Sequence, residues 1–241
     1  MFRSGNPTLS EKIFNQNGES LATGEAMTVS GTVNKIGILF LLVLIGASVS
    51  WYMPSSILMW GGAIGGFIVA LITIFKKEWA PITAPLYAGL EGLFLGAISV
   101  MYADLYYEGI VTTAVALTMG IFAAMLMIYR SGLIEVTQKF RMGIAAATGG
   151  IFLVYIATWI LGFFGINVGL ISGTGVWGIG FSLLIIVIAA LNLVLDFDLI
   201  DRGAAQGAPK YFEWYTAFGL IVTLVWLYIE ILRLLGKLQR R

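Results

Sequence analysis

Carboxylic acids placed in or beside long apolar runs are the residues of this chain that could carry chemistry. Glu91, Asp196 and Glu230 lie inside such runs, and Asp198 and Glu213 lie near the ends of two of them. An ionised carboxylate is costly in hydrocarbon, so acids retained in apolar segments usually mark an ion path or a proton path. We therefore expect the functional site among these five acids.

Two of these acids from different helices could act as a pair. Two carboxyls within hydrogen-bonding distance cannot both ionise at low cost, so they share a proton and titrate in two coupled steps. The protonated pair bridges two helices, whereas the deprotonated pair repels, loosens the helices and offers hard oxygen ligands to Ca²⁺. Such a pair would couple pH, gating and the passage of a divalent cation.

Each acid also has a simpler interpretation. Asp198 and Glu213 could be hydrated acids at span ends, and the dipole of a helix favours a negative charge in its first turn, where Glu213 falls. Glu230 precedes Arg233 by one helical turn, so the two could form a local ion pair. The remaining two acids could be protonated or hydrogen-bonded residues that only assist packing.

Composition predicts a protein that crosses the membrane several times. Hydrophobic residues make up 59% of the chain, charged residues 11%, and the mean hydropathy is +0.92; an ordinary soluble domain is about 45–50% apolar and about 25% charged. The net charge of +1 and the absence of a basic stripe argue against a nucleic-acid partner. The chain has no cysteine and no histidine, which excludes thiolate and imidazole chemistry, so we expect no enzymatic activity and no bound cofactor.

The elements that must position the acids are seven apolar runs, each close to the roughly 20 residues that a spanning helix needs. They cover residues 36–51, 57–75, 83–103, 110–129, 142–164, 176–200 and 212–235. The sequence therefore predicts an all-α, integral membrane bundle of seven transmembrane helices over residues 35–241, preceded by a polar cytoplasmic tail over residues 1–34. No apolar run precedes Ile36, so we expect no signal peptide.

Basic residues predict the orientation of the bundle. They gather in the tail and in the second, fourth and sixth breaks between the apolar runs, whereas the first, third and fifth breaks have none. This bias places the N-terminus in the cytoplasm. Lys237, Arg240 and Arg241 disagree with it, because a seventh span would carry them to the other side. Either the upstream bias overrides them or the last segment does not cross fully.

Glycines recur at four-residue spacing, which lets helix backbones approach closely. The pairs are Gly61 and Gly65, Gly62 and Gly66, and Gly92 and Gly96. We expect them to serve packing within one bundle.

Three segments around the acids resemble the Bax inhibitor-1 family, the transmembrane Bax-inhibitor-motif proteins. They are residues 90–99 (LEGLFLGAIS), 196–200 (DFDLI) and 227–232 (LYIEIL). The opening FRSGNP over residues 2–7 is similar to the start of a bacterial branch of that family. The resemblance covers about residues 35–236, and it implies seven membrane helices, a bacterial cytoplasmic membrane and a pH-gated Ca²⁺ leak.

The resemblance also implies roles for individual acids. Asp196 matches the family's acid late in the sixth helix, and Glu230 matches the acid in the seventh, where the family usually has Asp. The two would then form the pH sensor and a Ca²⁺ site. Their separation is about ten residues longer than the family pattern, and a turn near residues 203–209 would place Glu230 roughly 15 Å deeper than Asp196. Glu213 is closer in height, unless part of residues 211–218 lies outside the bilayer.

The sequence thus predicts a pH-sensitive leak for cations, most simply Ca²⁺, in a bacterial plasma membrane. Asp196 is the expected core of the sensor with Glu230 or Glu213 as its partner, and Glu91 and Asp198 are expected along the ion path. Two other functions stay open. One is a non-conducting regulatory protein that binds another membrane protein such as a protease or translocon, and the other is a proton-coupled transporter.

Overall fold

The computed structural model describes residues 26–165 and 173–240, and this part of the chain is helical apart from an isolated bridge between Ala26 and Pro209. The long helices are α2 (Val29–Tyr52), α3 (Ser56–Phe75), α4 (Ala80–Leu105), α5 (Gly109–Arg130), α6 (Gln138–Phe163), α8 (Val176–Ala205) and α9 (Phe212–Gln239), and the short 3-10 helix η2 (Lys77–Trp79) precedes α4. All seven long helices are long and apolar enough to cross a membrane, where α4 is counted together with η2. The predicted all-α, seven-span bundle is confirmed.

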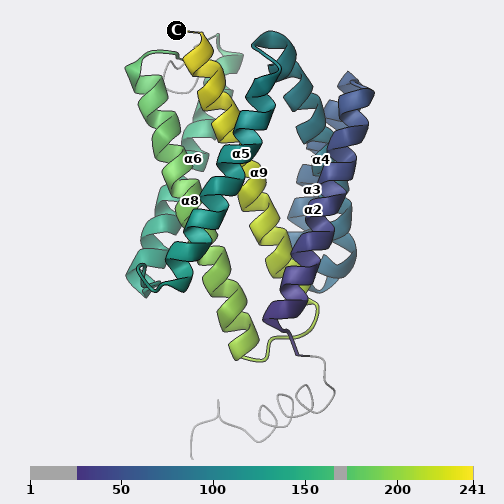
Figure 1. Cartoon of the computed structure of the whole chain (residues 1–241), viewed down its shortest axis with the longest axis vertical. Coiled ribbons are helices and arrows are strands. Elements are labelled where there is room, and N and C mark those ends of the chain that lie inside the picture. The colour runs from purple at the N-terminus through teal and green to yellow at the C-terminus, as the bar shows by residue number, and fades with distance from the viewer. Residues whose placement is uncertain (1–25, 166–172, 241) are drawn as a thin grey trace, which may run out of the picture.

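Helix α9 forms the centre of the bundle (Figure 1). It packs against α2, α4, α5 and α8, and its buried positions include Phe218, Leu220, Ile221 and Thr223, which point to different sides of the helix. A helix that is apolar on all sides is stable when other helices surround it. The two acids on α9 therefore lie in the interior of the protein.

Glycines bring α2, α3 and α4 into backbone contact. A Cβ atom on Gly92 would lie 2.4 Å from the carbonyl oxygen of Val43, and one on Gly62 would lie 2.6 Å from that of Leu90. Both distances are too short for a side chain, so these glycines are required by the packing of neighbouring helices. Gly61 has open space where its Cβ would stand. The expectation of packing within one bundle is confirmed for Gly62 and Gly92.

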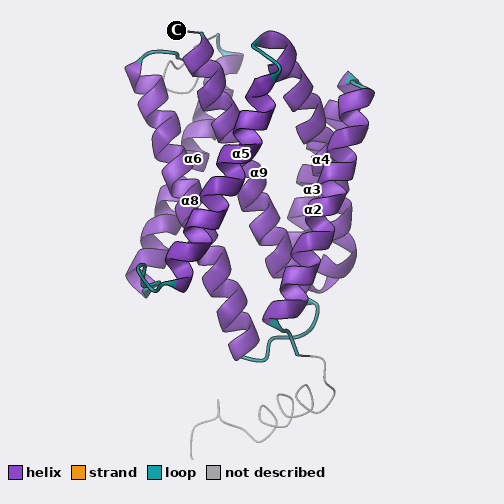
Figure 2. Ribbon diagram, in the orientation of Figure 1, coloured by secondary structure: helices purple, strands orange, loops and turns teal. Residues whose placement is uncertain are grey.

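The connections of the bundle gather at two ends (Figure 2). The start of α2 and the connections that follow α3, α5 and α8 lie at the lower end in this view. The basic residues of the predicted second, fourth and sixth breaks belong to this end, which we call the basic end: Lys76, Lys77, Arg130, Lys139, Arg141, Arg202 and Lys210. Helix α9 runs from the basic end to the opposite end, so the last segment has the full length of a span.

The first helix begins earlier than the hydropathy predicted. Residues 29–34, assigned from sequence to the polar tail, form the first turns of α2. Immediately before them, the Met27 amide donates a 2.7 Å hydrogen bond to the carbonyl of Ala208, which ties the chain to the α8–α9 connection. The remainder of the predicted tail, residues 1–25, and most of the fifth break, residues 166–172, lie outside the described residues.

Candidate functional site

A row of polar side chains on α6 faces α8 and α9. Arg141, Thr148 and Tyr155 follow one another at intervals of seven residues, which is close to two helical turns, so they share one side of the helix. Each of them contacts a polar side chain of α8 or α9. We call this line of contacts the polar seam.

At the basic end, the polar seam begins with Asp198 between two arginines. Its carboxylate lies 3.2 Å from Nε of Arg141 on α6 and 2.8 Å from Nη2 of Arg202 on its own helix. Charge-assisted hydrogen bonds thus join this carboxylate to two guanidinium groups. The predicted ion-path residue Asp198 is thus paired with two arginines in this structure.

The middle of the polar seam is an amide contact. Asn192 Nδ2 donates 2.9 Å to Oγ1 of Thr148 on α6 and 2.8 Å to the carbonyl of Ile188 on α8. Both donor hydrogens of the amide are therefore used inside the bundle, as expected for a polar group away from water.

At the opposite end, the polar seam closes on Glu230. Its Oε1 accepts a 2.7 Å hydrogen bond from Nη1 of Arg233, one turn further along α9. The hydroxyl of Tyr155 donates to the same Oε1, and Arg233 also contacts that hydroxyl. The local ion pair between Glu230 and Arg233 is confirmed, and Tyr155 connects it to α6.

Asp196 lies between these ends and has no cation beside it in the described structure. Its Oδ2 is buried and lacks any hydrogen-bond partner there, and its Oδ1 lies 3.9 Å from where a Cβ would stand on Gly219 of α9. Asp196 follows Asn192 by one turn on the same side of α8. A Cβ on Gly219 would be in ordinary van der Waals contact with this carboxyl, so Asp196 faces α9 at the level of Gly219.

The height of Asp196 separates it from both predicted partners. Because Asp196 stands beside Gly219, a rise of 1.5 Å per residue places Glu213 about 9 Å and Glu230 about 16 Å away along α9. The value for Glu230 agrees with the depth predicted from sequence. A direct carboxyl pair would need α8 to slide along α9, and the pairing therefore stays a prediction.

Glu213 is held at the start of two helices. Its Oε1 accepts hydrogen bonds of 2.9 Å from the Thr28 amide and 3.0 Å from the Thr28 hydroxyl, and it forms a 2.7 Å ion pair with Lys210. Thr28 is the N-cap of α2, and Glu213 itself lies in the first turn of α9. A negative charge is favourable at both helix N-termini, which gives Glu213 a structural role.

Glu91 lies away from the polar seam, on α4 facing α3. It is buried, and its Oε2 lies 2.8 Å from the position of a Cβ on Gly66. Glycine at position 66 therefore makes the space that this acid occupies. The structure places Asp198 and Glu230 in the polar seam, Asp196 beside it between α8 and α9, and Glu91 outside it.

Acidic ligands for a resident metal do not gather in the part of the chain that the structure describes: no group of three or more acids could hold an ion. Ca²⁺ takes six to eight oxygen ligands. Asp196 on α8 lies at the level of Gly219, well below Glu230 along the axis of α9. The predicted Ca²⁺ site at these two residues stays a prediction. It concerns an ion that binds transiently during transport.

The sequence did not single out Arg141 and Thr148 as residues of the site. The signal that could have found them is the seven-residue repeat of polar residues in an apolar helix. It was hidden because Arg141 falls at the edge of its span, where basic residues are ordinary.

Comparison with known proteins supports the resemblance seen in the sequence. No curated protein matches the chain. A model described as Bax inhibitor 1 like matches residues 6–240, which includes all seven membrane helices. The chain therefore belongs to the Bax inhibitor 1 like family.

Proposed function

We propose that this membrane protein is a pH-regulated cation leak that carries Ca²⁺ along the polar seam. One observation carries the proposal: Asp196 has a buried oxygen without a hydrogen-bond partner, and it lies one turn of α8 from Asn192, in the middle of the polar line that joins α6, α8 and α9 in the described structure. A buried carboxyl without a cation beside it favours its neutral form. Removing its proton places a negative charge inside the bundle, where it attracts a cation.

The charges at the two ends of the polar seam suit a closed state. Arg141 and Arg202 stand at the basic end and Arg233 at the opposite end, and each is paired with an acid. In these pairs the carboxylate oxygens already bind guanidinium groups, and the positive charge of those groups repels an entering cation. Opening would require these pairs to separate, which turns Asp198 and Glu230 into oxygen ligands for the passing ion.

Helix α6 is the element that can move at the lowest cost. Among its residues only Ile144 and Ile151 are buried, and α8 is its principal neighbour. Little apolar packing would therefore be lost if α6 turned away from α8 and α9. Loss of the Asp196 proton favours that movement, so we expect the leak to increase as pH rises.

Ca²⁺ flux into proteoliposomes tests the proposal. Purified wild-type protein and Asp196→Asn are compared across about pH 5 to 8, a range that lies above the ordinary titration of carboxyl groups. Asp104→Asn is the matched control, because Asp104 is exposed at the end of α4. We expect flux that rises with pH in the wild type and the control, and a flat profile in Asp196→Asn.

The outcome also separates the alternatives. If folded, correctly inserted protein passes no Ca²⁺ at any pH, the leak proposal fails and a non-conducting regulatory role takes its place. If flux occurs only with an opposing proton gradient and is stoichiometric with proton movement, the protein is a proton-coupled transporter.

A further inference from the structure

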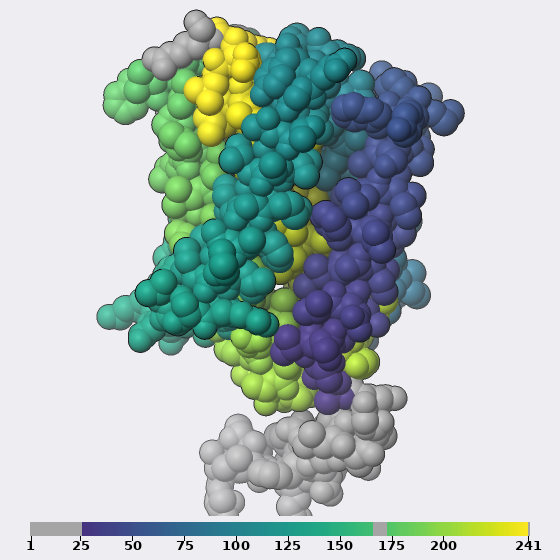
Figure 3. Space-filling view, viewed as in Figure 1, coloured from purple at the N-terminus to yellow at the C-terminus, as the bar shows by residue number. Residues whose placement is uncertain are grey.

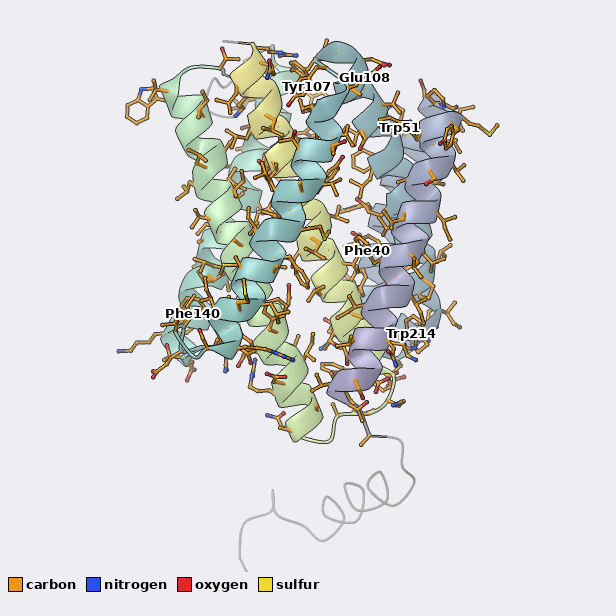
Figure 4. All side chains as sticks on the ribbon, viewed as in Figure 1. Phe40, Trp51, Tyr107, Glu108, Phe140 and Trp214 are labelled. Carbon is orange, nitrogen blue, oxygen red and sulfur yellow. The ribbon has the colours of Figure 1, made fainter. Side chains whose placement is uncertain are left out.

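A deep apolar crevice runs between α2 and α5. It consists of two adjoining cavities of about 480 Å³ and 320 Å³, which share Phe40, Met119 and Leu224. Helix α5 packs on α4, α8 and α9, and α2 packs on α4 and α9, so α9 forms the floor between them. Figure 3 shows yellow atoms of α9 at the bottom of the furrow between α5 (teal) and α2 (purple), and Figure 4 shows Phe40 on the α2 side of this furrow.

The larger cavity has the depth of one membrane leaflet. Along α2 it extends from Val29 to Phe40, which is about 17 Å at 1.5 Å per residue. Half of a hydrocarbon core of about 30 Å is about 15 Å. Its walls are mainly apolar, and the volume falls within the range of ligand sites. A single acyl chain entering from the basic end would fill it in the orientation of a bilayer lipid.

The mouth of this cavity carries one positive and one negative group. Arg130, the last residue of α5, and Asp201 of α8 both line it at the basic end. Arg130 forms no ion pair within residues 26–165 and 173–240, although an acid lines the same cavity. The Tyr129 hydroxyl donates a 2.8 Å hydrogen bond to Oδ2 of Asp201, which leaves Oδ1 to accept another donor.

We propose that this crevice binds one phosphatidylethanolamine molecule. One of its two acyl chains would occupy the larger cavity and the other would stay in the surrounding lipid, while its phosphate would contact Arg130 and its primary ammonium would donate to Asp201. Arginine suits phosphate because its planar guanidinium offers paired donors. A purely anionic headgroup would face Asp201 without a compensating cation, and the quaternary ammonium of phosphatidylcholine has no N–H to donate.

Native mass spectrometry of the whole protein tests this assignment. The protein is equilibrated with equal amounts of palmitoyl-oleoyl phosphatidylethanolamine, phosphatidylglycerol and phosphatidylcholine, and the lipids retained in the gas phase are identified. We expect one phosphatidylethanolamine per chain. Arg130→Gln and Asp201→Asn should each lower its retention several-fold, whereas Lys139→Gln, an exposed charge at the same end, should leave it unchanged.

A pair of glycine substitutions tests the cavity itself. Gly37 lines the larger cavity and Gly61 lies on α3 outside it, and both have open space at the Cβ position. Gly37→Leu should fill the cavity and abolish lipid retention, while Gly61→Leu should retain it. Circular dichroism and a monodisperse elution profile establish that both variants fold.

Three results would overturn the proposal. Equal retention of the three lipids would show ordinary annular lipid, and a preference for phosphatidylglycerol that survives Asp201→Asn would show a simple anion site. Equal retention in Gly37→Leu and Gly61→Leu would place the lipid elsewhere. None of these results depends on Ca²⁺ flux, so this inference stands or falls independently of the proposed leak.

Discussion

The side chain of Lys237, near the end of α9, donates a 2.8 Å hydrogen bond to the backbone carbonyl of Gly178, in the first turn of α8. The same ammonium donates 2.9 Å to Oγ of Ser182, and the lysine is 6% exposed. Lys237 was one of the basic residues that disagreed with the charge bias of the sequence. It is an internal tether between the two helices that carry Asp196 and Glu230.

Replacing Lys237 should loosen this tether. Lys237→Met keeps much of the apolar stem but removes both hydrogen bonds from the charged donor. Hydrogen bonds to charged groups contribute about 1.5–3 kcal/mol, so we expect a clear fall in the midpoint of thermal unfolding in detergent. Arg240→Met is the control, because within the described part of the chain Arg240 makes a cation–π contact with Tyr106 and no ion pair. Equal midpoints for the two variants would contradict the tether.

Adding one methyl group should distinguish the glycines that hold backbones together from those that do not. Gly92→Ala would place a Cβ 2.4 Å from the carbonyl of Val43, so α2 and α4 must separate. Overpacking of this kind typically costs about 1–3 kcal/mol. Gly61→Ala has open space and should be neutral or stabilising by roughly 0.5–1 kcal/mol. Thermal unfolding of the two variants, measured side by side, checks whether their changes in stability have opposite signs.

Glu213→Gln should lower stability without removing the pH response of flux. Its pair with Lys210 contributes little, because the lysine side chain is half exposed. The hydrogen bonds from Thr28 lose their charged acceptor but keep an amide oxygen, so we expect a cost of about 1–2 kcal/mol. Unfolding and Ca²⁺ flux are measured on the same preparation. A flat pH profile would instead make Glu213 the partner of Asp196.

Tyr155→Phe should weaken the closure of the polar seam at the end opposite the basic one. The substitution removes the hydroxyl that connects Glu230 and Arg233 to α6 but leaves their ion pair in place. We expect larger Ca²⁺ flux at every pH, with the pH dependence retained because Asp196 is intact. Thr158→Val is a useful comparison, since among the residues that the structure describes this hydroxyl bonds only to its own helix, at Val154. Flux in Tyr155→Phe equal to that in Thr158→Val would argue against this closure.

The sequence was sufficient to predict the seven spans, because hydropathy over 20 residues reports directly on the cost of exposing a backbone to lipid. It also offered the ion pair of Glu230 with Arg233 as one interpretation of Glu230, and that pair depends only on spacing within one helix. It could not predict that Asp196 lies beside Gly219 or that Glu213 caps α2 through Thr28. Those contacts depend on the relative height and rotation of helices, which spacing along one chain does not determine.

The polar seam also links movement to hydration. If α6 leaves α8 and α9 within hydrocarbon, the hydroxyl of Tyr155 loses Glu230 and the amide of Asn192 loses Thr148, and lipid offers no partner in exchange. Water is the solvent that can satisfy them. Separation of α6 and the entry of a column of water are therefore one event, and a dry open state of this bundle is not available.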